Sequence, residues 1–178
     1  ESLNGSWASV DANVTASGGS PIAEAVAVRD AIDAVILEQY DNVIGHTDVF
    51  LEGRRGKVRT EETNLGNLSS DAMMWAAKRF AKSEERNGVP APSFAVRNGG
   101  GIRASIGYVD ADTSERKGGP IRKLDIESAL RFDNELMLVT TTHAVLRQTL
   151  ESALRGVGTG RGSFPHFSDE VEMTFHPA

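Results

Sequence analysis

The residue types most suited to ligand chemistry gather at a run of glycines that follows an apolar segment. Residues 94–103 read Phe-Ala-Val-Arg-Asn-Gly-Gly-Gly-Ile-Arg. Three successive glycines allow positive φ angles and a close approach of a ligand, because no Cβ stands in the way. Asn98 offers two donors and an acceptor suited to the edge of a nucleobase, and Arg103 offers a planar fork suited to phosphate or vicinal hydroxyls. A tight turn without a ligand is the alternative.

The four histidines do not form a metal-binding pattern. They occur singly, at His46, His143, His166 and His176, and the chain contains no Cys. A catalytic zinc needs about three protein ligands, and a dinuclear centre needs more. The sequence has no Gly-x-Ser-x-Gly elbow, and the glycines of 156–160 neither follow an expected strand nor open an expected helix, as a dinucleotide site requires. We therefore expect no cofactor, no metal site and no catalytic residues in this chain.

Length and charge limit the class of partner. The 178 residues fit one domain, and 19 Lys and Arg against 25 Asp and Glu give a net charge of −6. Such a surface repels a nucleic-acid polymer, so an anionic ligand has to be held by a local cationic pocket. The cluster Arg54, Arg55 and Lys57 is expected in an exposed hairpin loop or, as the alternative, steers an anionic substrate towards Arg59. No apolar run approaches the ~20 residues that span a bilayer.

Apolar spacing predicts the helices that must position these side chains. Residues 21–40 carry apolar side chains at helical spacing after a Ser-Pro start signal. A second helix begins near Asn64, where Thr63 and Asn64 can accept hydrogen bonds from the first-turn amides. Its buried stripe is expected to contain Leu65, Leu68, Ala72, Trp75, Ala76 and Phe80.

The remaining elements complete an α+β fold, with helices packed on a mixed sheet. Asp125 is expected to cap a short helix that ends at Leu130, and a third helix spans 143–154. The side chains of that third helix expected to point inward are Val145, Leu146, Leu150 and Leu154. Strands are predicted at 43–45, 49–51, 93–96, 135–141 and 171–175. We interpret residues 1–20 as a peripheral strand or linker and residues 21–178 as the domain.

Five ordered segments carry a resemblance to a known family: 59–72, 98–103, 130–134, 142–151 and 164–168. Together they resemble the C-terminal domain of the 5′-nucleotidase family, which includes periplasmic UDP-sugar hydrolases and secreted or surface-anchored nucleotidases. The third segment is similar to the family's Leu-Pro-Phe-Gly-Asn turn, the fourth to its Thr-Gly-x-x-Leu-x-x-x-Leu-Glu segment, and the fifth to its Phe-Pro-Gln-Val-Ser-Gly. The resemblance covers roughly residues 40–178.

The resemblance implies that two domains have separate roles. In that family an N-terminal metallophosphoesterase domain holds two divalent metals and performs the hydrolysis, and the C-terminal domain binds the nucleoside part of the substrate. The chain is therefore expected to bind a nucleotide or nucleoside, to work with an N-terminal catalytic domain of the same parent chain, and to be periplasmic or extracellular. The arginines would face ribose or phosphate, the asparagine would face the base, and the phenylalanine would stack on it. The residues implied in substrate contact are Arg59, Asn98, Gly99, Gly100, Gly101, Arg103 and Phe132.

The sequence also departs from the family pattern. Arg131 and Asp133 stand where Pro and Gly are usual, and His143 stands where a glycine is usual. The family's second stacking aromatic follows a Gly-Gly-Asp-Gly motif that this sequence lacks, so we expect a domain without its C-terminal end and only weak binding. Two alternatives stay open: a protein-interaction domain without nucleotide binding, and a nucleotidase relative specialised for cyclic nucleotides or UDP-sugars.

Overall fold

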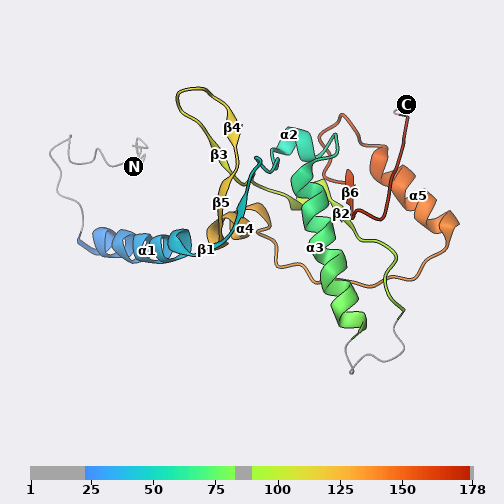
Figure 1. Cartoon of the computed structure of the whole chain (residues 1–178), viewed down its shortest axis with the longest axis horizontal. Coiled ribbons are helices and arrows are strands. Elements are labelled where there is room, and N and C mark those ends of the chain that lie inside the picture. The colour runs from blue at the N-terminus through green and yellow to red at the C-terminus, as the bar shows by residue number, and fades with distance from the viewer. Residues whose placement is uncertain (1–22, 83–89, 177–178) are drawn as a thin grey trace, which may run out of the picture. The chain divides into compact units, whose positions relative to one another are not determined.

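The computed structural model describes residues 23–82 and 90–176, and contacts divide the chain into two units, Glu1–Asp41 and Asn42–Ala178 (Figure 1). The linker expected at 1–20 lies outside the described residues. Helix α1 spans Ala23–Asp41, which confirms the first predicted helix over its described part. Among the described residues, none of the helices combines the length and apolar character that crossing a membrane requires.

The strands of the second unit pair in antiparallel twos. Strand β1 (Val43–Thr47) pairs with β5 (Gly119–Arg122), β2 (Val96–Asn98) with β6 (Pro165–Phe167), and β3 (Tyr108–Val109) with β4 (Arg116–Lys117). The α+β class is confirmed. Within the described residues, however, the expected mixed sheet is replaced by these three two-stranded ribbons.

Helices and one turn of 3-10 helix connect the ribbons. They are α2 (Arg55–Val58), α3 (Asn64–Ala81), the 3-10 helix η3 (Gly99–Gly101), α4 (Lys123–Ala129) and α5 (His143–Leu154). Helix α3 lies against β2 and β6 (Figure 1). The core joins α2, α3, η3 and α4 through Leu51, Val58, Leu65, Ile102, Ile106 and Ala129.

Three predicted strands are wrong because their segments find no hydrogen-bonded partner strand among the described residues. Residues 135–141 are exposed and unpaired, and residues 171–175 form no strand, although burial alternates along them and the ring of Phe175 packs edge-on at 6.1 Å from that of Phe164. Of residues 49–51, only Leu51 makes an isolated bridge, to Ile106. The strand expected at 93–96 begins at its last residue.

Helix α3 begins where predicted but buries a different face. The Thr63 hydroxyl accepts from the Gly66 amide at 3.2 Å, and the Asn64 side-chain oxygen accepts from the Leu65 amide at 2.9 Å, which confirms the predicted start. The predicted apolar stripe is wrong beyond Leu65: Leu68 is 49% and Trp75 63% exposed. The buried residues are Leu65, Gly66, Ser69, Ser70, Met74 and Ala77.

Close packing between α3 and β6 explains why α3 buries a different face from the predicted one. The Ser70 hydroxyl donates to the main-chain oxygen of His166 in β6 at 3.1 Å, so α3 turns its small residues towards that strand. Trp75 lies outside, with the Arg79 guanidinium 4.7 Å from its ring centroid. An arginine that stacks on an exposed indole ring covers part of the ring's apolar surface and keeps that part away from water.

Three further expectations are corrected. The basic segment 52–59 contains helix α2 and not a hairpin, because Val58 is fully buried in the core while Arg54 and its basic neighbours stay exposed. Helix α4 begins at Lys123, two residues before Asp125, whose carboxylate accepts from the Arg122 amide at 2.7 Å. Helix α5 has the predicted bounds, but only Leu146, Leu150 and Leu154 are half-buried among its four expected inward residues, and Val145 is 52% exposed.

The contact between α3 and β6 predicts the effect of Gly66→Ala. An added Cβ would meet Nδ1 of His166 at 2.1 Å, so the helix or the strand must shift. We expect the free energy of unfolding to fall by about 1–3 kcal/mol, as measured by urea denaturation. The control is Gly45→Ala, where the new Cβ meets nothing within 4 Å. Equal stability of the two variants would contradict the packing described for α3.

Candidate functional site

The candidate site is built around one backbone carbonyl, that of Val58 at the end of α2. Nε2 of His166 donates to this oxygen at 2.9 Å, and His166 is 1% exposed. A Cβ on Gly99 would lie 1.7 Å from the same oxygen, so only glycine permits this approach. Because Arg59 follows Val58 and Asn98 precedes Gly99, the crossing of η3 over α2 brings these two side chains to the same region.

The glycine run has a different role from the one expected. Gly99, Gly100 and Gly101 form a 3-10 turn, and none of them has a positive φ. The expectation that these glycines use positive φ angles is therefore wrong. The Gly99 amide donates to the Phe164 oxygen at 2.7 Å, and the Gly100 amide donates to the Gly162 oxygen at 2.9 Å. The first two glycines are therefore used for close approach to the protein's own backbone.

Arg59 and Asn98 share a neighbour, the loop between α5 and β6. Nη1 of Arg59 donates to the Gly160 oxygen at 2.6 Å, and Nδ2 of Asn98 donates to the Gly162 oxygen at 3.0 Å. Asn98 is exposed and Arg59 half-buried. Both side chains are thus held by main-chain oxygens of one short segment.

Arg103 and Phe132 form the other half of the site. The Arg103 amide donates to the Ala129 oxygen at 2.8 Å, which joins the chain after η3 to the end of α4. The Arg103 guanidinium then lies 5.5 Å from the ring centroid of Phe132. This ring is 48% exposed. Phe132 is therefore on the surface beside a cation, where a planar ligand can reach it.

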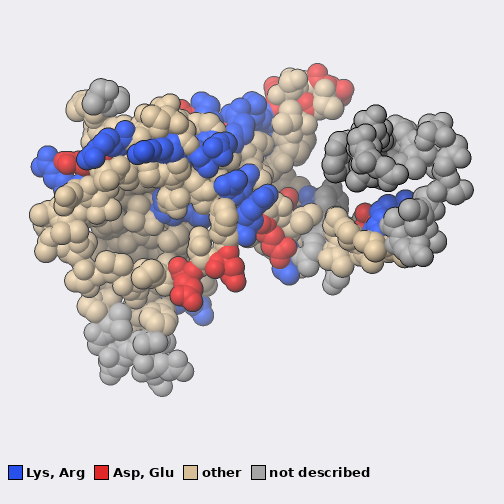
Figure 2. Space-filling model, turned by 180° about the vertical axis from the view of Figure 1, so that it is seen from behind, with Lys and Arg blue, Asp and Glu red and all other residues tan. Residues whose placement is uncertain are grey.

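Electrostatics link the two halves. Burial, together with the positive charges of Arg55 and Arg103, lowers the pKa of Arg59 below its usual value. Within the described residues, none of these three guanidiniums has a carboxylate at ion-pair distance, whereas Arg54 is paired with Glu52 and Lys57 with Glu61. Figure 2 shows Lys and Arg side chains gathered across one face of the molecule. Unpaired cations held close together favour an anion between them.

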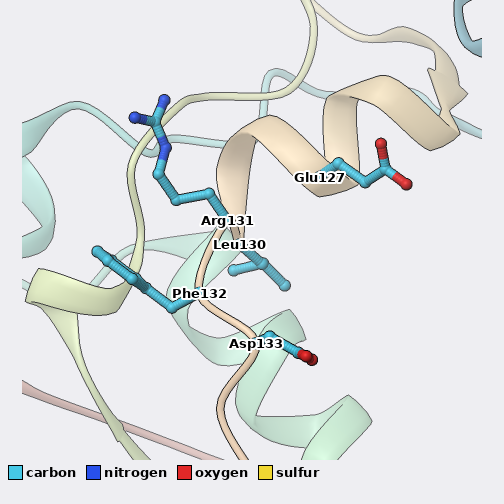
Figure 3. A pocket seen from close by; sticks show the side chains of 5 residues that line it. All are labelled: Glu127, Leu130, Arg131, Phe132 and Asp133. Carbon is cyan, nitrogen blue, oxygen red and sulfur yellow. The ribbon is translucent and has the colours of Figure 1, made fainter.

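A shallow pocket adjoins the Phe132 turn. It has a volume of about 170 Å³ and is lined by Glu127, Leu130, Arg131, Phe132 and Asp133. Figure 3 shows Phe132 and Arg131 pointing to one side of this turn, and Leu130 and Asp133 to the other. Of the two residues that depart from the family pattern, Arg131 therefore lies on the same side of the turn as the ring, and Asp133 points away from it.

The structure places Arg59 and Asn98 beside the loop that precedes β6 and Arg103 beside Phe132, and it adds contacts that the sequence did not reveal. The Gly156–Gly162 loop supplies the main-chain oxygens that accept from Arg59 and Asn98, and His166 donates to the Val58 oxygen next to Arg59. The spacing of residues along the sequence did not indicate these hydrogen bonds, because each one joins two residues that are more than sixty positions apart. Within the described part of the chain, no group of three or more His, Asp or Glu lies close enough together to hold a metal ion.

A family model described as "5'-nucleotidase, C-terminal domain" matches residues 43–178. The chain belongs to this 5′-nucleotidase C-terminal domain family. The match begins at the first strand of the second unit and includes every residue of the site described above.

Individual relatives agree. The trifunctional nucleotide phosphoesterase protein YfkN of Bacillus subtilis is 36% identical over 132 residues, which cover 74% of this chain and 8% of that protein. A 5′-nucleotidase of Rattus norvegicus is 32% identical over 161 residues, covering 85% of this chain and 26% of that protein. The crystal structure of a 5′-nucleotidase precursor from Thermus thermophilus aligns with a TM-score of 0.59 and 29% identity, over 78% of this chain and 23% of that one. The chain thus spans a minor part of each relative.

The buried histidine at the centre of the site predicts a pH dependence of stability. Burial, and to a smaller extent the charge of Arg97, lowers the pKa of His166, although the hydrogen bond to Val58 opposes this. An unfolded histidine titrates near 6.5, so below about pH 6.5 the unfolded state binds a proton that the folded state resists. The free energy of unfolding is then fully present above that pH and falls as the pH drops towards the lowered pKa, by at most about 1.4 kcal/mol per pH unit.

Urea denaturation between about pH 5 and pH 7.5, on either side of the ordinary histidine pKa, measures this slope. His166→Gln keeps a donor for the Val58 oxygen and should flatten the slope, whereas His143→Gln, which changes an exposed histidine, should not. The lowered pKa values of Asp110 and Glu170, both about 2, place their effects below this window. An unchanged slope in His166→Gln would show that this histidine titrates freely.

Proposed function

We propose that this domain recognises the nucleoside 5′-phosphate part of a nucleotide and positions it for hydrolysis by a separate catalytic domain. The observation that carries the proposal is the convergence of Arg59, Asn98, Arg103 and Phe132 around η3 and the ends of α2 and α4. Membership of the 5′-nucleotidase C-terminal domain family supports the class of ligand.

Each group has chemistry that suits part of a nucleotide. The exposed ring of Phe132 offers a stacking surface for a base, a contact that contributes about 1–3 kcal/mol and tolerates different bases. Arg59 and Arg103 supply charge-assisted donors for phosphate or ribose oxygens. Asn98 uses one amide donor internally and keeps an exposed side chain for a base edge.

In this proposal a different domain carries out catalysis. Hydrolysis of a phosphate ester in this class needs metal-activated water and stabilisation of charge at phosphorus. We assign those metals to an N-terminal catalytic domain of the same parent chain, and the described residues here act only in binding and orientation. Relatives that include snake venom 5′-nucleotidases support a location outside the cytoplasm.

Titration with AMP, followed by amide NMR shifts of the full chain, tests this function. We expect perturbation of residues 98–103 and of the amides around 132, with a millimolar dissociation constant, because the described site offers one aromatic ring and can stack on only one face of a base. Phe132→Ala and Arg103→Ala should each weaken binding roughly 5-fold or more, as the loss of a stacking or charge-assisted contact implies.

The chain provides a matched control for both variants. Arg79 and Trp75 form the same kind of exposed cation–π pair on α3, outside the site. Trp75→Ala and Arg79→Ala should leave the affinity for AMP unchanged. Silence of all amides at about 10 mM AMP, which corresponds to a binding free energy weaker than about 3 kcal/mol, would favour a protein-interaction domain instead.

A further inference from the structure

The loop between α5 and β6 has an unusual construction for a connection at a binding site. Residues 156–162 read Gly-Val-Gly-Thr-Gly-Arg-Gly. Gly158 and Gly160 adopt φ angles of 84° and 75°, in the left-handed region, and a Cβ built on either meets nothing within 4 Å. The tip of the loop therefore owes its shape to backbone conformation rather than to side-chain packing.

Hydrogen bonds hold the two ends of this loop, and one further hydrogen bond holds its tip. At its N-terminal end the loop forms a turn, in which the Thr159 amide and hydroxyl both donate to the Gly156 oxygen, at 3.1 and 2.7 Å. At the other end the Gly162 oxygen accepts from the Gly100 amide and from the Asn98 side chain. Between them, Arg59 donates a hydrogen bond to the Gly160 oxygen and so joins the tip to the end of α2.

This hydrogen bond occupies one of the N–H donors that Arg59 could offer to a ligand. Arg59 is one of three guanidiniums that lie near one another without a carboxylate partner among the described residues, and a neutral carbonyl compensates a cation less well than an anion does. A phosphate oxygen that binds the same Nη1 N–H has to displace the Gly160 oxygen. In this exchange Arg59 loses a neutral acceptor and gains a charged one, and the tip of the loop is released.

We propose that the Gly156–Gly162 loop is a strap that closes the empty site through Arg59 and opens when a phosphate-bearing ligand displaces the Gly160 oxygen. The inference rests on the proposed function of the same site. It adds that the strap regulates this site. The apparent affinity for the ligand is proportional to the fraction of molecules in which the strap is open.

The strap predicts an unusual direction for a loop mutation. Gly160→Ala and Gly158→Ala each place a Cβ on a residue with positive φ, which strains the closed loop without a clash in the surrounding space. If closure opposes binding, both variants should bind AMP and inorganic phosphate more tightly than the parent chain, by roughly 3- to 10-fold. Gly45→Ala, which adds a Cβ in open space outside the site, is the control and should bind like the parent chain.

A ligand-free measurement tests the tether by itself. Arg59→Ala should lower the heteronuclear NOE values of the amides at 158–161, whereas Arg103→Ala removes a guanidinium from the same cluster and should not. Unchanged NOE values in Arg59→Ala would overturn the strap. So would weaker or equal binding by both glycine variants, because a loop that supports the site loses affinity when strained. Failure of the parent chain to bind either probe would overturn the proposed function, and the strap with it.

Discussion

The whole site depends on the close approach of η3 and β6 to the Val58 carbonyl. That oxygen accepts a hydrogen bond from a buried histidine and lies so near Gly99 that no side chain fits between them. Gly66 in turn makes room for the histidine ring. Two segments distant in sequence, η3 and β6, are thereby fixed against the end of α2, and the side chains next to the crossing point, Arg59 and Asn98, are positioned as a consequence.

This arrangement explains how the glycine run contributes to packing. The glycines let backbone meet backbone, and the residues on either side of them, Asn98 and Arg103, are displayed at the surface. The same crossing gathers guanidiniums whose charges are not neutralised by carboxylates among the described residues. Holding like charges together opposes folding, so this cluster is not a source of stability, and an anion between the guanidiniums would offset their repulsion.

Packing accounts for most differences between the expected and observed elements. The predicted apolar stripe of α3 followed hydrophobicity, but β6 approaches so closely that Gly66 and Ser70 form the contact with His166 and Trp75 is left outside. The apolar segment 135–141 has the composition of a strand, yet a strand needs a partner for its backbone, and the described residues provide none. Neither outcome can be derived from local spacing, because both depend on what lies opposite.

The sequence by itself determined the α+β class, the starts of α3 and α5 at Asn64 and His143, and the residue types able to bind a nucleotide. These depend on interactions within a few residues: a capping hydroxyl, helical spacing, an ordered set of short motifs. The tertiary structure alone decided which oxygens hold Arg59 and Asn98, which face of α3 is buried, and where His166 lies. These contacts join residues 64 to 108 positions apart, and only the three-dimensional packing of the chain selects them.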